Sequence, residues 1–166
     1  MTATVAPTLT APIEHGRIRQ LLPHRHPVLL VDRVLELEPM RRIVGIKAIT
    51  GSEPCYAALA EDLAPSRFAY PPALIIESFG QTGALLWLSS VGATEGTLIF
   101  AAARDVEFFR PVLPGDVLRH EARVDQIVGA NAFLSGETWV GDELVARVGS
   151  AIAVVRPTDG LGGGGA

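Results

Sequence analysis

Residues 71–90 constrain the fold of this chain most strongly, because two prolines open an apolar run that contains no further proline. Proline is tolerated in the first turn of a helix, where the backbone N–H has no intrahelical partner. Apolar side chains lie on every side of the predicted helix, and such a helix is usually buried. The sequence therefore predicts one long helix that the rest of the chain encloses.

A single carboxylate, Glu77, lies in this predicted helix, and Gln81 follows it on the same face. A buried carboxylate is costly unless it is paired, hydrogen-bonded or used in chemistry. The alternative is a glutamate near the helix N-terminus that the helix dipole favours and that points to water. Glu77 is the first candidate functional residue, and both interpretations are open at this point.

The segments on either side of the helix have the composition of strands. Gly129-Ala130-Asn131 and Gly141-Asp142 are typical hairpin turns. Strands that cluster around a single helix indicate an α+β fold in which a curved antiparallel sheet wraps the helix. A second subunit is the natural cover for the remaining side of the helix. The predicted strands are 28–38 and 41–50 before the helix, and 97–109, 117–128, 132–140 and 143–155 after it.

Length and composition indicate one globular domain. The chain has 166 residues, of which 48% are hydrophobic and 19% charged. We expect a single domain over 15–157, between disordered tails at 1–14 and 158–166. The net charge of −4, without a basic run, argues against nucleic acid or an anionic membrane surface as the partner.

The cysteine content and the hydropathy pattern bear on the location of the protein. Cys55 is the only cysteine, so no internal disulfide can form. No apolar run reaches transmembrane length, and no secretory signal is recognisable at the start. These features predict a cytoplasmic protein.

His24 and His26 lie in a turn bracketed by Pro23 and Pro27. Two histidines one residue apart suggest a metal site, but no neighbouring cluster of Cys, His or acidic residues completes a ligand set. We therefore expect no metal site, and a structural loop in which one histidine is hydrogen-bonded.

Three stretches resemble the hotdog-fold (3R)-hydroxyacyl-acyl-carrier-protein dehydratases of fatty acid synthesis. The first is Leu-Pro-His-Arg-His-Pro-Val-Leu-Leu-Val-Asp-Arg-Val at 22–34, and the second is Leu-Ile-Ile-Glu at 74–77 together with Gln81. The third is Phe-Arg-Pro-Val-Leu-Pro-Gly-Asp at 109–116. The resemblance covers residues 16–156 in the family's order.

This resemblance implies a function and a site. In the family a histidine removes the α-proton of a β-hydroxyacyl thioester, and the helix carboxyl protonates the leaving hydroxyl. Glu77 would be that carboxyl, with Gln81, Tyr70 and Phe109 as substrate-binding residues. The substrate would be an acyl thioester on acyl-carrier protein or coenzyme A, and no cofactor is expected. The two catalytic groups come from opposite subunits, so the family implies a homodimer or a heterodimer.

The chain departs from the family pattern at two positions. The family's histidine lies in a Gly-His-Phe-Pro run, and the residue that stands in its place before Glu77 is Leu63. No histidine occurs between 27 and 119. Pro72 replaces a family glycine, and proline has no N–H to donate to a thioester oxygen. The pattern predicts a degenerate form of the site.

Three interpretations follow, and whether the chain is an enzyme is open among them. The chain is a histidine-lacking subunit that supplies Glu77 opposite a partner's histidine, in fatty acid or polyketide biosynthesis. Alternatively it is self-sufficient, either as a dehydratase or isomerase with a substitute base or as a thioesterase that uses Glu77. The third interpretation is a non-catalytic module that binds acyl chains or carrier protein. The substitute bases considered are Asp62, Cys55, Tyr56 and Tyr70, although tyrosine and cysteine are poor bases near neutrality.

Overall fold

The computed structural model describes residues 11–60, 62–91, 97–129 and 131–156. Most of the expected N-terminal tail and all of the expected C-terminal tail lie outside these residues. Ile13 and Glu14, at the end of the expected N-terminal tail, contact the first strand. Ile13 is buried and forms a bridge with Val34, and Glu14 forms an ion pair with Arg33.

The described chain contains two helices, two short 3₁₀ turns and six strands. The helices are α1 (His15–Leu21) and α2 (Pro72–Val91), and the 3₁₀ turns are η1 (Pro54–Tyr56) and η2 (Pro65–Phe68). The strands are β1 (Arg33–Glu38), β2 (Arg42–Ala48), β3 (Thr97–Phe108), β4 (Val117–Val128), β5 (Asn131–Val140) and β6 (Glu143–Arg156). The predicted order of two strands, one long helix and four strands is confirmed.

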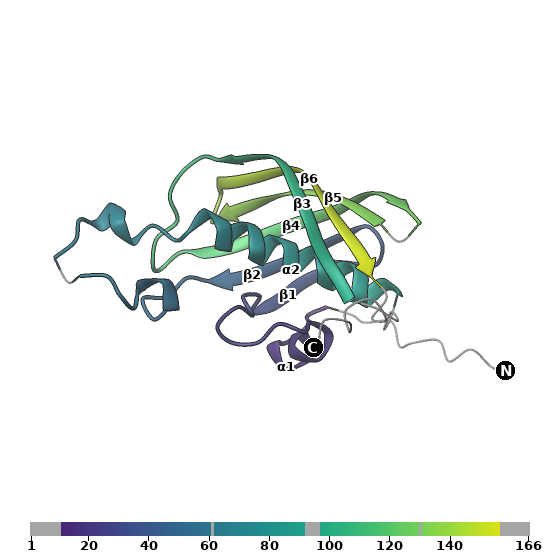
Figure 1. Ribbon diagram of the computed structural model, residues 1–166, viewed down its shortest axis with the longest axis horizontal. Coiled ribbons are helices and arrows are strands. Elements are labelled where there is room, and N and C mark those ends of the chain that lie inside the picture. Colours follow the sequence, from purple (N-terminus) through teal and green to yellow (C-terminus); the bar gives the residue numbers. More distant parts are fainter. Residues whose placement is uncertain (1–10, 61, 92–96, 130, 157–166) are drawn as a thin grey trace, which may run out of the picture.

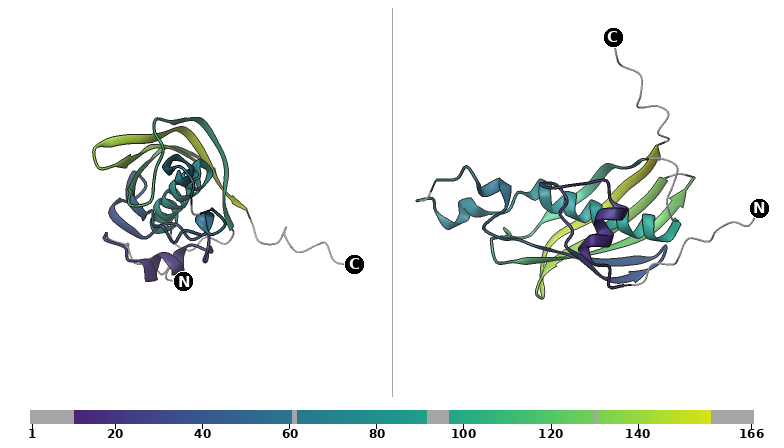
Figure 2. Two further views of the ribbon diagram at one scale, coloured as in Figure 1. Left: turned by 90° about the vertical axis from the view of Figure 1, so that its left-hand side faces the viewer. Right: turned by 90° about the horizontal axis from the view of Figure 1, so that it is seen from below.

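The six strands form one antiparallel sheet in the order β1-β2-β4-β5-β6-β3. The sheet curves around α2, which is seen end-on in the left view of Figure 2 and along its length in Figure 1. This is the α+β hotdog fold that the sequence predicts. The order places β1 and β3 at the two edges of the sheet.

Local chemistry explains the hairpins and the face that each strand presents. Gly129 and Gly141 have φ of +59° and +57°, a conformation that glycine adopts without steric cost, and each joins two neighbouring strands. In β4, Leu118, His120 and Ala122 are buried, and the residues between them face outward. This alternation is the period of two that a half-buried strand requires.

The helix α2 is buried on most of its surface, as predicted. Phe79, Leu85 and Leu86 are fully buried in the main core. Part of the cover on the side away from the sheet comes from the same chain, because α1 contacts α2 and Ile18 of α1 belongs to the same core. Figure 2 shows α1 lying across the helix outside the sheet. No helix among the described residues is long and apolar enough to cross a membrane.

The first strand begins later than the sequence predicts. Residues 28–32 precede β1, and two of their backbone groups bond to a side chain of α2: Leu30 donates to Gln81 and Val28 accepts from it. The apolar composition that predicted a strand here instead buries Leu30 and Val31. A short apolar run does not by itself distinguish a strand from a buried extended segment.

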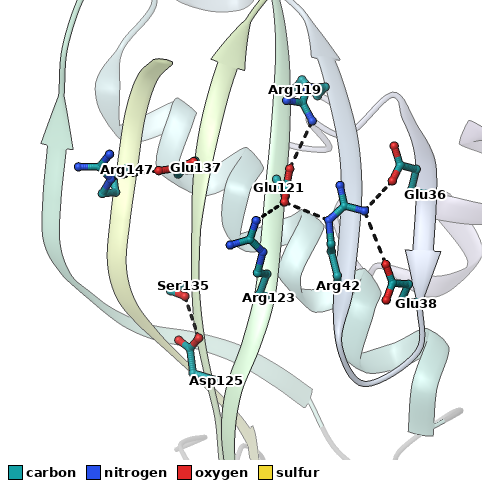
Figure 3. Close-up of polar contacts among 10 residues, drawn as sticks. All are labelled: Glu36, Glu38, Arg42, Arg119, Glu121, Arg123, Asp125, Ser135, Glu137 and Arg147. Atoms are coloured by element: carbon teal, nitrogen blue, oxygen red, sulfur yellow. Dashed lines mark hydrogen bonds and ion pairs between the residues drawn. The ribbon is translucent and has the colours of Figure 1, made fainter. Parts of the chain in front are cut away.

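Charged side chains cover the face of the sheet away from α2 (Figure 3). Glu121 accepts hydrogen bonds from Arg42 at 3.0 Å and Arg119 at 3.4 Å, and also from Arg123. The guanidinium of Arg42, followed by that of Arg123, lowers the pKa of Glu121 to about 2, against the opposing effect of burial. The network connects β2 with β4 by charge-assisted bonds.

Candidate functional site

Gln81 holds the carboxyl of Glu77 in a fixed position. Its Nε2 donates to Glu77 Oε1 at 2.8 Å and to the carbonyl of Val28 at 2.6 Å. Its Oε1 accepts from the backbone N–H of Leu30 at 2.9 Å. Gln81 is 2% exposed, so this side chain is almost wholly withdrawn from water and fully bonded. The predicted pairing of the two residues on one helix face is confirmed, and the loop before β1 adds two further bonds.

His24 lies against the same carboxyl, which the sequence did not predict. Its Nε2 is 3.5 Å from Glu77 Oε1, and the two side chains remain 32% and 36% exposed. Its Nδ1 is buried and has no hydrogen-bond partner within the described part of the chain. Packing and the contact with Glu77 therefore orient the ring. The sequence signals at His24 were the proline-bracketed turn and the family-like stretch at 22–34, and neither reports the distance of His24 from α2.

Glu77, Gln81 and His24 line a cavity of about 270 Å³. The rest of the lining consists of apolar or small residues from α2, β3 and β6. A few polar groups that converge on an otherwise apolar cavity are typical of small-molecule sites. The remaining lining residues are Gly80, Ala84, Ile99, Phe100 and Ala153.

Tyr70 and Phe109 line a second cavity, of about 380 Å³, near the first turn of α2. Tyr70 is 1% exposed, whereas Phe109 is 49% exposed. None of the residues that line this cavity lines the first one. The structure therefore brings Glu77 and Gln81 together with His24, and places Tyr70 and Phe109 at a separate site.

The loop residues considered as substitute bases lie away from Glu77. None of the described residues of 51–70 lines the cavity that contains the carboxyl. Burial raises the pKa of the Cys55 thiol, raises that of Tyr56 to about 12, and raises that of Tyr70 further. Deprotonation of these groups near neutrality is therefore disfavoured, and Asp62 is exposed on the loop.

A second histidine, His120, is fully buried beneath α2. Its Nε2 is 2.7 Å from Ser78 Oγ, and its Nδ1 is 2.9 Å from Thr138 Oγ1. Burial lowers its pKa to about 3, which keeps the ring neutral. A neutral imidazole offers one donor and one acceptor nitrogen, and the two hydroxyls satisfy both. This ring joins α2 to β4 and β5 and is closed to substrate.

Among the described residues, no group of three or more His, Cys, Asp or Glu side chains is arranged to hold a metal ion. The polar side chains that line the cavity are one carboxyl, one amide and one imidazole. The carboxyl and the imidazole can give and take protons, and the amide can orient a polar group.

Comparison with known proteins gives a consistent result. Residues 22–149 match the family described as the FabA-like domain. The chain is 40% identical over 136 residues to the 3-hydroxyacyl-[acyl-carrier-protein] dehydratase FabZ of Symbiobacterium thermophilum, covering 82% of this chain and 93% of that protein. It is 38% identical over 142 residues to the protein of the same name from Desulforamulus reducens, covering 86% and 97%.

Solved structures share the fold at lower identity. The dehydratase heterocomplex ApeI:P from Xenorhabdus doucetiae matches with a TM-score of 0.65 and 15% identity, over 86% of this chain and 92% of that one. The uncharacterised protein PH1136 from Pyrococcus horikoshii matches with a TM-score of 0.60 and 15% identity, over 87% and 94%.

Proposed function

Because the chain belongs to the FabA-like domain family, we propose that it acts in the dehydration of a 3-hydroxyacyl thioester carried by an acyl-carrier protein, with Glu77 as a proton-transferring group. The observation that supports this most is the fixed carboxyl at the cavity. One of its oxygens is held by Gln81, while the side chain is still 36% exposed. A carboxyl that is positioned but accessible can exchange a proton with a bound hydroxyl.

The names of the FabZ relatives supply the substrate class of the proposal. The apolar lining residues Ile99, Phe100 and Ala153 suit an acyl chain, and the polar lining residues can bond to a β-hydroxyl. A cytoplasmic location and assembly as a dimer are parts of the same proposal.

The test is hydration of a short trans-2-enoyl thioester, which runs the same reaction in reverse, by the wild-type chain and the Glu77→Gln variant. Loss of a general acid or base lowers rates about 10²- to 10⁴-fold. Glu38→Gln is the matched control, because Glu38 pairs with arginines on the outer face of the sheet. We expect Glu77→Gln to fall by about 10²-fold or more and Glu38→Gln to match the wild type. Equal activity in all three proteins would contradict the role of Glu77.

One feature of the sequence favours a heterodimer with a different hotdog subunit. Leu63 stands where the family's histidine would lie before Glu77, so the chain fits the role of a subunit that gives its carboxyl to a histidine-bearing hotdog partner. This assembly predicts activity only after such a partner is added, and loss of that activity in Glu77→Gln. Release of free thiol, followed on the same samples, reports thioester hydrolysis by either assembly.

A further inference from the structure

We infer that His24 is the second acid–base residue of the Glu77 cavity, so that one chain carries both proton-transferring groups. This inference rests on the proposed function, because it assigns a role within the same reaction. It differs from the family's arrangement, in which the histidine lies in a Gly-His-Phe-Pro run shortly before the acid and acts from the opposite subunit.

The four histidines of the chain differ in their surroundings. His15 and His26 are exposed, and His120 is fully buried with both ring nitrogens bonded to hydroxyls. His24 alone among them lines the cavity with Glu77. An imidazole is the side chain whose charge changes most readily near neutral pH, so it is the most suitable proton-transfer group available there.

The geometry of His24 and Glu77 suits proton transfer with a bound substrate. His24 Nε2 and Glu77 Oε1 are 3.5 Å apart, close to hydrogen-bonding distance, and both side chains are accessible to a ligand. In a structure without substrate such contacts are commonly long. Gln81 holds the same oxygen of Glu77 and the backbone of Val28 and Leu30, four to six residues after His24. One amide therefore ties both members of the pair to a common frame.

The dehydration balances with these two groups alone. The C–H electron pair at the α-carbon becomes the double bond, and its proton passes to the unprotonated member of the pair. The C–O bond at the β-carbon breaks, and the hydroxyl leaves as water with the proton of the protonated member. One proton then crosses from the newly protonated group to the other and restores the pair. The overall change is loss of water, so no oxidant or cofactor enters.

The experiment compares hydration of a short trans-2-enoyl thioester by the wild type, His24→Gln, His24→Ala and His26→Gln. Glutamine keeps an N–H that can donate to Glu77 but cannot carry a proton in the catalytic cycle. We expect both His24 variants to lose kcat by about 10²-fold or more with little change in KM, while His26→Gln matches the wild type. The limb of the pH–rate profile due to the imidazole should disappear in His24→Gln.

Three outcomes would overturn the inference. Activity in His24→Gln with loss in His24→Ala would make His24 a positioning residue for Glu77. Full activity in both His24 variants, with loss in Glu77→Gln, would place the second group elsewhere and leave the proposed function intact. If the wild-type chain is inactive alone but active with a histidine-bearing partner, the partner supplies the second proton-transferring group. Failure of the proposed function itself is distinct, because Glu77→Gln would then change nothing in any assembly.

Discussion

The buried histidine beneath α2 predicts how the stability of the fold depends on pH. His120 is fully buried, and its pKa is lowered to about 3, compared with roughly 6.5 for an unfolded chain. Between these two values the unfolded chain binds one proton that the folded chain does not. The contribution of His120 is therefore fully present above about pH 6.5 and is lost as the pH falls toward about 3.

The magnitude follows from the linkage between proton binding and unfolding. One proton bound only by the unfolded state lowers the free energy of unfolding by about 1.4 kcal/mol for each pH unit. Between about pH 6.5 and about pH 5 the loss should reach about 2 kcal/mol. Glu121 does not change this slope, because its ordinary pKa of 4.5 and its lowered pKa of about 2 in the folded chain both lie below this interval. Its contribution is lost only at lower pH.

The assay is urea unfolding of the wild type and of His120→Gln at several pH values in this interval. Glutamine can bond to the hydroxyls of Ser78 and Thr138 but does not titrate. We expect the difference in unfolding free energy between the two proteins to shrink by about 2 kcal/mol from the upper to the lower pH. His15→Gln is the matched control, because His15 is exposed on α1, and it should follow the wild type throughout. Parallel curves for His120→Gln and the wild type would refute the reasoning.

Three further substitutions test other parts of the structure. Glu121→Gln should lose less unfolding free energy than the wild type between about pH 4.5 and about pH 2, because the arginine partners of Glu121 lower the pKa of its carboxyl to about 2. An equal loss in both proteins would contradict this. Gly136→Ala should destabilise the fold by about 1–3 kcal/mol in urea, since a Cβ there would lie 2.0 Å from the carbonyl oxygen of Glu121. Gly51→Ala, where a Cβ would meet nothing within 4 Å, is its control. Gln81→Leu should lower kcat for hydration by about tenfold or more, because Glu77 loses its donor; an unaltered kcat would show that the carboxyl needs no such anchor.

The sequence predicted the elements whose signals are local. Alternation in β4 and the glycines at 129 and 141 are properties of short segments, so the hairpins were confirmed. The pairing of Glu77 with Gln81 also follows from helix geometry alone, since residues four apart share a face.

The remaining features depend on the fold as a whole. His24 reaches Glu77 only because the turn after α1 packs on α2, and nothing in the spacing of the two residues reports that contact. Tyr70 and Phe109 were expected to bind substrate together with Gln81, and they line a different cavity from Gln81. His120 lies on the inner face of β4, and its contact with Ser78 joins elements that are not neighbours along the chain.

The bonds of Gln81 to the segment before β1 have a consequence for folding order. They join residues 51 and 53 positions apart, so the entropy of closing a long loop must be overcome before they form. The backbone hydrogen bonds of helix α2 join residues that are close in the sequence, so the helix can form before the bonds of Gln81. A partly folded chain would thus have its helical content but not the assembled pair of His24 and Glu77. Catalytic activity should therefore return later than helical circular dichroism when the protein is refolded.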